Sequence, residues 1–518
     1  MQLQTRSILG VGLALAASSI GCGDGVEARD VNILLVSYDT LRADRLGAYG
    51  NTEWGESTSP ALDALAEKGV LFENAYAPRG QTHPSLASML TGKYPITTGL
   101  RENGYPLARE HTTLFELLQS AGVQTGVFVS NLEVGHPAEE WVARGADRAG
   151  DGISGNRPRA GTNDESRLQV QWDDRVEQDA LEYLRSVDGS RPFAMWAHFY
   201  DPHKPYNPPR THVDRFGVSE GLPPVLRSPG PRSHMDLELH IKAITLGERE
   251  ASDAELTRIR GLYDATLRRT DNRLKHLLEE LEKMGELDST YVVFTSDHGE
   301  ELYDHNRYFY HGASIYDGVL RLPLVISGPD VMEGIRTDQL VRNIDIAPTL
   351  LELMGLPTEP AMEGTSVAPL LRGESPDAPI EFAVAEWQDL IYAVSDGRHK
   401  LIYNEKHTHP RKSPYPPGRG FRIDCIEAYD LQADPLEQIN LLAGFDLEDL
   451  DGGRGLPEEF QPHWTALRDF LSHPDHQGGI DLDGLDDMQR RRLAQLGYVS
   501  SVSENRNDSV QLAPCVER

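Results

Sequence analysis

The sequence predicts an α/β fold, an α/β/α sandwich around a large, mostly parallel sheet, followed by a small C-terminal α+β subdomain. Short apolar runs bounded by turn residues are typical of buried strands. Amphipathic stretches with helical spacing alternate with these runs, which indicates a parallel sheet covered by helices on both faces. The 518 residues, 39% of them hydrophobic, suffice for one large domain and a smaller one.

The expected strands and helices follow one another along most of the chain. Strands are predicted by apolar runs at residues 31–37, 123–130, 193–199, 290–295 and 322–326. Helices are predicted between them at residues 59–68, 175–186 and 256–284. In the last of these, leucines recur near helical spacing with charged residues between them, which indicates one buried face.

The character of the chain changes after about residue 380. Short antiparallel strands are expected at residues 391–394, 400–403 and 428–431. Two polar segments, residues 152–167 and 207–236, are interpreted as surface loops or lids. The predicted organisation is an export signal (1–22), a main domain (30–380), a C-terminal α+β subdomain (381–500) and a polar tail (501–518).

The N-terminus resembles a bacterial export signal. Arg6 supplies a positive charge, an apolar stretch covers residues 8–17, and small residues follow. Residues 19–22 (SIGC) resemble a lipobox, in which an acylated Cys22 becomes the first residue. Two acyl chains anchor a protein stably in a membrane. We therefore expect an exported protein, lipid-anchored and facing the periplasm or exterior. Simple secretion and a buried N-terminal helix are the alternatives.

Composition excludes some partners. The formal net charge of −31 argues against nucleic acid, which requires a basic surface. No internal run approaches the roughly 20 apolar residues of a membrane-spanning helix. No protein partner is predicted. Cys425 and Cys515 either pair in an oxidising compartment or stay reduced, and the sequence leaves both possibilities open.

Candidate metal ligands stand directly after three predicted strands. Asp39 follows the first strand, His203 follows the strand at 193–199, and Asp297 and His298 follow the strand at 290–295. In open α/β sheets this edge is where ligands bind. Carboxylates and imidazoles that converge from separate strands suit a divalent cation. Any one of these residues alone is more often a turn, cap or structural residue, so their coincidence is what favours a metal site.

Thr82 is the candidate nucleophile. It precedes Pro84, which is favoured in a first helical turn, and an apolar helical run at residues 86–90. Thr82 is therefore expected near a helix N-terminus, where backbone N–H groups attract an anion. The alternative from the pattern alone is that Thr82 only caps this helix.

Four segments resemble motifs of the sulfatase family in the alkaline phosphatase superfamily. They are residues 39–50 (DTLRADRLGAYG), 82–92 (THPSLASMLTG), 201–206 (DPHKPY) and 295–300 (TSDHGE). Weaker matches at residues 345–350, 363–366, 400–403, 429–431, 434–435 and 440–441 extend the resemblance over nearly the whole chain. The resemblance implies a metal-dependent hydrolase of anionic sulfate or phosphate esters, in which His203 contacts the transferred group.

The sequence departs from the sulfatase pattern at the nucleophile and around it. Sulfatases oxidise a cysteine or serine to formylglycine, whereas oxidation of Thr82 would give a ketone, which argues against formylglycine here. Leu86 replaces an arginine, Thr40 replaces the second aspartate of the first metal pair, and His311 stands where a lysine is expected.

The departures resemble phosphoethanolamine and phosphoglycerol transferases of the same superfamily. The resemblance implies one divalent cation, bound by Asp39, Thr82, Asp297 and His298. The sulfatase likeness suggests Ca²⁺, and the histidine ligand makes Mn²⁺ or Zn²⁺ plausible. Thr82 would attack the ester, while His203 and His311 contact the transferred group or protonate the leaving group. A second metal on these two histidines stays open. The alternatives to hydrolysis are group transfer to an alcohol and a catalytically degenerate protein that binds anionic glycans.

Overall fold

The structure is a computed structural model that describes residues 28–476 with gaps. The gaps are residues 133–135, 137–138, 153–164, 207, 214, 218–221, 228–232, 306–308, 313, 377, 388–390, 405–422, 446–449, 451–452, 454 and 474–475. The predicted export signal with Cys22, the polar tail and Cys515 lie outside the described residues. What the sequence predicts for them therefore stays a prediction.

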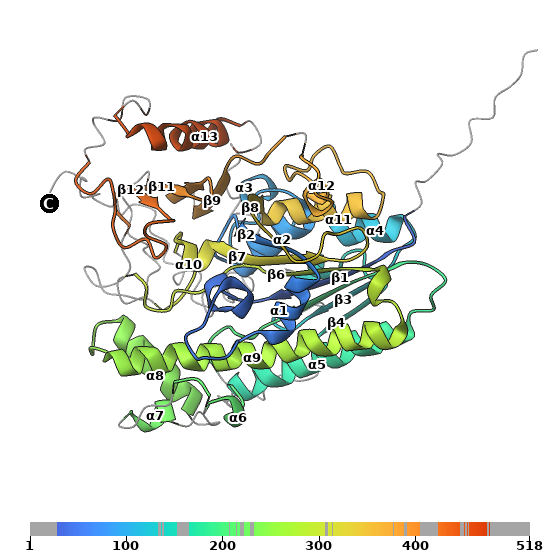
Figure 1. The fold of residues 1–518 in the computed structure, drawn as a ribbon, viewed down its shortest axis with the longest axis horizontal. Coiled ribbons are helices and arrows are strands. Elements are labelled where there is room, and N and C mark those ends of the chain that lie inside the picture. Colours follow the sequence, from blue (N-terminus) through green and yellow to red (C-terminus); the bar gives the residue numbers. More distant parts are fainter. Residues whose placement is uncertain are drawn as a thin grey trace, which may run out of the picture.

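The main sheet has eight strands in the order β4-β3-β5-β1-β6-β7-β2-β8 (Figure 1). The strands are β1 (Asn32–Tyr38), β2 (Gly69–Tyr76), β3 (Gln124–Val129), β4 (Arg148–Asp151), β5 (Phe193–Phe199), β6 (Thr290–Ser296), β7 (Arg321–Ser327) and β8 (Ile335–Arg342). All five predicted strands of the main domain are present, with ends within one or two residues of those expected. The sequence did not identify β2, β4 and β8.

One strand runs against the others. β7 is antiparallel to both of its neighbours, β6 and β2, whereas the remaining neighbouring pairs are parallel. A parallel connection usually needs a crossover helix. The segment between β6 and β7 holds only the four-residue helix α10 (Asp317–Leu320) among its described residues. The predicted sheet, mostly parallel, is confirmed with this exception.

Helices cover both faces of the main sheet. Figure 1 shows α5 and α9 on one side and α2, α4, α11 and α12 on the other. The helices outside the C-terminal part are α1 (Pro60–Glu67), α2 (Thr82–Thr91), α3 (Pro95–Thr98), α4 (Leu114–Ser120), α5 (Glu165–Ser186), α6 (Arg210–Val213), α7 (Pro224–Arg227), α8 (Ser233–Thr245), α9 (Asp253–Met284), α10, α11 (Ile346–Leu353) and α12 (Ala368–Leu371). The leucine face of α9 is buried against the sheet, as its spacing predicted.

Residues 207–236, predicted as a surface loop or lid, contain short helices that the sequence did not predict. This segment contains α6, α7 and the start of α8, and α5 begins at Glu165, inside the other expected loop. Helices of four residues are too short to show a periodic pattern. Buried Arg258 of α9 stabilises α6 and α7 through hydrogen bonds to the carbonyl oxygens of Val213 (3.0 Å) and Leu226 (2.8 Å).

A second, antiparallel sheet forms the C-terminal part, as expected. Its strands, in the order β12-β11-β10-β9, are β9 (Ala383–Trp387), β10 (Ile391–Ser395), β11 (His399–Asn404) and β12 (Ile426–Asp430). Helix α13 (Gln461–Ser472) packs on β10 and β11. Cys425 is disulfide-bonded. None of the helices in the described part of the chain is long and apolar enough to cross a membrane.

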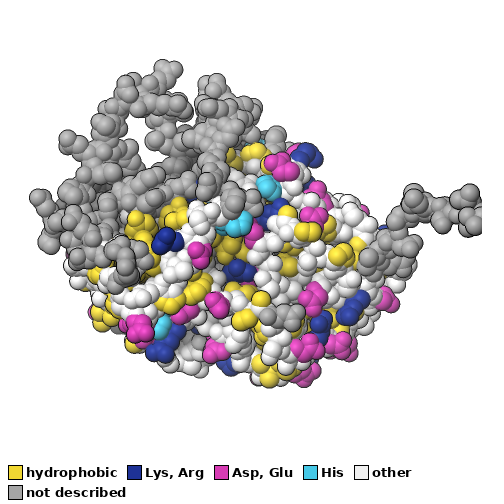
Figure 2. Space-filling model, turned by 90° about the horizontal axis from the view of Figure 1, so that it is seen from above, with side chains coloured by type: hydrophobic (Ala, Val, Ile, Leu, Met, Phe, Trp, Pro, Cys, Tyr) yellow, Lys and Arg dark blue, Asp and Glu magenta, His cyan; other side chains and the backbone are white. Residues whose placement is uncertain are grey.

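Acidic and basic side chains are interspersed on the described part of the face drawn in Figure 2. The excess of acidic residues is therefore spread over this face and does not form one acidic patch.

Asp271 of α9 stabilises the start of α1 from outside that helix. Its carboxylate oxygens accept hydrogen bonds of 2.9 Å from the N–H groups of Ala61 and Leu62. These N–H groups have no partner within α1, because the first turn of a helix lacks the preceding carbonyls. Burial nevertheless raises the pKa of Asp271 to about 6.

This pKa predicts a pH-dependent contribution to stability. The folded state holds the Asp271 proton more tightly than the unfolded chain, so the contribution is fully present below about pH 4 and is lost as the pH rises through 6. Relative to Asp271→Asn, the wild type should lose roughly 3 kcal/mol of unfolding free energy over this range. Urea unfolding of both proteins at pH 4, 5, 6 and 7 measures this. A difference that does not change with pH would contradict the prediction.

Candidate active site and metal centre

Three of the predicted metal ligands lie together at the carboxyl edge of the main sheet. Asp39 directly follows β1, and Asp297 and His298 directly follow β6. Because these strands are parallel neighbours in which Tyr38 pairs with Ser296, the residues after them emerge side by side. One ligand atom from each of Asp39, Asp297 and His298 lies within 4.8 Å of the others. The structure therefore brings the expected ligands together.

The donor atoms of this cluster fit a divalent cation. Asp39 Oδ1 and Asp297 Oδ2 are buried and accept no hydrogen bond from a described residue. Unpaired buried carboxylate oxygens are costly without a cation or a donor. His298 Nδ1 donates to Gly299 O at 2.9 Å, so Nε2 is the ring nitrogen that faces the two carboxylates and can bind a metal. This Nε2 lies 3.4 Å from Asp297 Oδ2 and 3.9 Å from Asp39 Oδ1.

Electrostatics give a second argument for a cation. Burial raises the pKa of Asp39 well above its ordinary value, and the charges of Asp297 and Glu300 raise it further. All three side chains are buried, Asp39 being 1% exposed and the other two 0%. Like charges in a buried site repel one another strongly. A bound cation would offset this repulsion and keep Asp39 ionised.

Thr82 is the first residue of α2, and its hydroxyl lies beside the ligand cluster. Thr82 Oγ1 is 3.4 Å from His298 Nε2 and 3.5 Å from Asp39 Oδ2. The N-cap position belongs to Gln81, whose side chain makes no capping hydrogen bond, and Thr82 is already helical, so the interpretation of Thr82 as a cap is wrong. Ser85 Oγ donates to Asp297 O at 2.5 Å and connects the first turn of α2 to the ligand loop. The helix N-terminus and the cluster thus meet at Thr82.

His203 and His311 lie next to this centre. The ring centroid of His311 is 4.5 Å from that of His298 and 5.2 Å from that of His203. His311 Nδ1 donates to Glu300 Oε1 at 3.0 Å, and His203 Nδ1 donates to Lys204 O at 2.7 Å. Because Nδ1 is the donor in each neutral ring, Nε2 is the nitrogen without a proton.

Both histidines are neutral near pH 7. Burial lowers the pKa of His203 to about 3, and the neighbouring His311 contributes. Burial also lowers the pKa of His311 well below its ordinary value, assisted by His298 and Lys204. A neutral imidazole with a bare Nε2 accepts a proton before it can donate one. Protonation of a leaving group by either ring therefore requires that the ring first takes up a proton.

Leu86 and Thr40, which both depart from the sulfatase pattern, lie in different surroundings. Leu86 is fully buried in the hydrophobic core between α2 and the sheet, where an arginine could not remain solvated. Thr40 adopts a φ of 59°, a strained conformation for a β-branched residue. Its N–H donates to Asp297 Oδ1 at 3.2 Å. At this position a backbone N–H therefore orients a ligand carboxylate.

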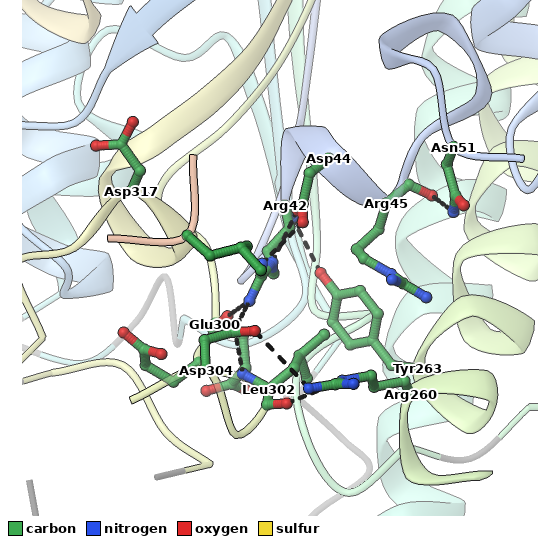
Figure 3. A network of polar contacts seen from close by, with 12 residues as sticks. Arg42, Asp44, Arg45, Asn51, Arg260, Tyr263, Glu300, Leu302, Asp304 and Asp317 are labelled. Atoms are coloured by element: carbon green, nitrogen blue, oxygen red, sulfur yellow. Dashed lines mark hydrogen bonds and ion pairs between the residues drawn. The ribbon is translucent and has the colours of Figure 1, made fainter. Parts of the chain in front are cut away.

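Arg42 of the first motif orders the loop that follows β6, as Figure 3 shows. Its Nε and Nη2 donate to the Asp44 carboxylate at 2.8 Å. Its Nη1 donates to Glu300 O at 2.9 Å and to the Asp304 carboxylate. Arg42 is 3% exposed, so its bonds to Glu300 and Asp304 are protected from water, whereas the Asp44 side chain is 46% exposed. The DTLRAD motif thereby holds the backbone of the residue that binds His311.

The sequence reasoning missed three polar residues that support the site. Asn131 Nδ2 donates to Asp39 Oδ2 at 2.6 Å. Glu300 binds His311, as described above. Asp173 of α5 accepts hydrogen bonds from the N–H groups of Tyr200 (2.8 Å) and Asp201 (3.1 Å), at the start of the turn that carries His203. Asn131 follows a predicted strand and could have been found by its position, whereas Asp173 lies on a helix and offers no such signal.

Comparison with known proteins agrees with this geometry. The family profile described as "Sulfatase" matches residues 31–356, and "N-sulphoglucosamine sulphohydrolase, C-terminal" matches residues 304–451. A choline-sulfatase of Rhizobium meliloti is 26% identical over 446 residues, covering 79% of this chain and 82% of the relative. An arylsulfatase of Clostridium perfringens is 27% identical over 460 residues, covering 79% and 90%.

A solved structure shares the fold. The phosphonate monoester hydrolase of Agrobacterium radiobacter superposes with a TM-score of 0.63 at 21% identity, covering 84% of this chain and 96% of that one. The sulfatase profile spans more than half of the chain, including β1, α2 and β6, which carry the candidate centre. The chain therefore belongs to the sulfatase family of the alkaline phosphatase superfamily and is a hydrolase of ester bonds.

Proposed function

We propose that the protein is a metal-dependent hydrolase of sulfate esters that uses the hydroxyl of Thr82 as its nucleophile. The observation that carries this proposal is the placement of Thr82 Oγ1 within 3.5 Å of both His298 Nε2 and Asp39 Oδ2, at the N-terminus of α2. The relatives named choline-sulfatase and arylsulfatase support sulfate esters as the substrate class.

A divalent cation held by Asp39, Asp297 and His298 would supply positive charge for the ester oxygens and lower the pKa of an adjacent hydroxyl. Thr82 Oγ1 attacks sulfur, and the bond between sulfur and the alcohol oxygen breaks. The Thr82 proton passes to the bare Nε2 of His203 or His311, which then returns it to the departing alcohol. Water cleaves the sulfo-threonine and releases sulfate.

Phosphorus esters are the second candidate substrates. Threonine replaces the residue that other sulfatases convert to formylglycine, and a threonine hydroxyl is also suited to attack on phosphorus. The fold shared with phosphonate monoester hydrolases supports the same possibility. Assays with the nitrophenyl sulfate, phosphate, phosphodiester and phosphonate esters separate the classes. Highest kcat/KM on the sulfate is expected. Turnover on phosphorus esters alone would replace the sulfatase proposal, and silence on all four would favour a binding protein.

Removal of divalent cations is expected to abolish hydrolysis, because the carboxylates of Asp39 and Asp297 would then repel the anionic ester. Protein purified without chelators is analysed for metal, stripped with EDTA and assayed with added Ca²⁺, Mn²⁺ or Zn²⁺. The restoring cation should also stabilise the fold, by about 2.7 kcal/mol at a free concentration 100 times its Kd. Full turnover by stripped protein that contains no metal would show that the cation is not required.

A further inference from the structure

Asn131 lies at the same sheet edge as the metal-ligand cluster. It follows β3 by two residues, and β3 is connected to β1 through β5 in the main sheet. Its side-chain nitrogen Nδ2 donates to Asp39 Oδ2 at 2.6 Å, the shortest of the contacts between this oxygen and a described side chain. No role in the reaction as proposed above requires this residue.

The contact makes the two oxygens of Asp39 different from each other. Oδ2 accepts the amide hydrogen of Asn131 and lies 3.5 Å from Thr82 Oγ1. Oδ1 has no hydrogen-bond partner among the described residues. A donor on one oxygen fixes the rotation of the carboxylate and leaves the other oxygen free. Asp39 would therefore present a single oxygen, Oδ1, to a cation.

The backbone around Asn131 is fixed by its neighbours. Ser130 donates to His198 O of β5 from both its N–H (3.1 Å) and its Oγ (3.2 Å). Asp173, which is fully buried, lies near Ser130. Asp173 in turn holds the turn at Tyr200 and Asp201. The residue that precedes Asn131 is thus fixed to the end of β5, close to the turn that Asp173 holds.

We propose that Asn131 is a positioning residue of the cation site, which orients Asp39 so that Oδ1 binds the cation and Oδ2 does not. The inference rests on the proposed function, since it assumes the cation site of Asp39, Asp297 and His298. The neutral amide of Asn131 also adds no negative charge beside the buried carboxyl groups of Asp39, Asp297 and Glu300. Residues that hydrogen-bond to a metal ligand without touching the metal typically contribute 10- to 100-fold to metal affinity.

The test measures cation affinity and not turnover. Chelator-stripped wild type, Asn131→Ala and Asn131→Leu are titrated calorimetrically with the cation that restores wild-type activity. Both variants should bind it about 10- to 100-fold more weakly, while their unfolding temperatures without the cation stay close to that of the wild type. Asn131→Leu keeps the side-chain volume, so it separates loss of the donor from loss of packing.

Asn103→Ala is the matched control. Asn103 is buried, and its side-chain oxygen accepts the N–H of His83 at 2.9 Å, next to Thr82. This variant should bind the cation with unchanged affinity. Equal affinity of the wild type and both Asn131 variants would overturn the inference and leave the proposed function intact. A wild type that binds none of the three cations would overturn the proposed site itself, and the role of Asn131 with it.

Discussion

Replacement of Thr82 by alanine is expected to reduce kcat by about 10⁴- to 10⁶-fold, as loss of a catalytic nucleophile does in other hydrolases. Thr82 is the first residue of α2, and its Oγ1 is 3.4 Å from His298 Nε2. Alanine keeps the helix and the ligand cluster but removes the attacking oxygen. Turnover of nitrophenyl sulfate by metal-loaded protein measures the effect.

Two variants control this experiment. Thr82→Ser keeps the hydroxyl and should retain activity within about tenfold, since only a methyl group is lost. Ser88→Ala removes another hydroxyl from the same helix, one that is fully buried and has no hydrogen-bond partner among the described residues, and should leave kcat unchanged. If Thr82→Ala turns over at the wild-type rate, the covalent step is wrong, and direct attack by water would replace it.

Replacement of Glu386 by glutamine is expected to have the largest effect on stability. Glu386 lies on β9 of the C-terminal sheet and pairs with two arginines of the main domain. Its carboxylate accepts hydrogen bonds from Arg101 Nε at 3.0 Å and Arg79 Nη1 at 3.3 Å. Arg79, Arg101 and Glu386 are 0%, 1% and 2% exposed. Removal of the negative charge leaves two buried guanidinium groups undercompensated, which typically costs about 3–5 kcal/mol.

The same change should also affect the nucleophile. Arg79 Nε donates to Gln81 Oε1 at 2.8 Å, and Gln81 directly precedes Thr82. Urea unfolding measures the loss of stability, and kcat measures the displacement of Thr82. Glu73→Gln is the matched control, because Glu73 pairs with Arg336 at 2.8 Å on the exposed surface and should contribute less than about 1 kcal/mol. Equal unfolding free energies of Glu386→Gln and wild type would show that the buried cluster does not need this charge.

Local patterns were sufficient for most of the fold. Apolar runs located β1, β5 and β6 to within one or two residues, because a strand buried on both faces leaves a continuous apolar signature. The long amphipathic pattern of α9 was equally clear. The four-residue helices α6 and α7 were missed, since hydrogen bonds from distant Arg258 stabilise parts that are too short to show a period. The antiparallel direction of β7 was also missed, because the apolar run of a buried strand does not reveal whether the strand is parallel or antiparallel to its neighbours.

The residues of the candidate site likewise differ in how far the sequence alone could identify them. Asp39, Asp297 and His298 were found because each follows a strand, and the carboxyl ends of parallel strands meet at one edge. His203 was also selected by its place after a strand, whereas His311 was selected from the family resemblance. The structure places the ring of His311 next to the rings of both His298 and His203. Asn131 obeys the same strand-end rule but was overlooked, since an asparagine in a turn is common.

The sequence by itself determined the α/β class, the family and the residues that form the candidate metal cluster, because strand periodicity and short motifs are local properties. Only the tertiary structure decided that Thr82 is not a cap, that Asn131 binds one oxygen of Asp39, and that Glu386 balances Arg79 and Arg101. These contacts join residues 43, 92, 285 and 307 positions apart. They depend on distance, burial and rotamer, which arise only when the sheet order brings separate strand ends together.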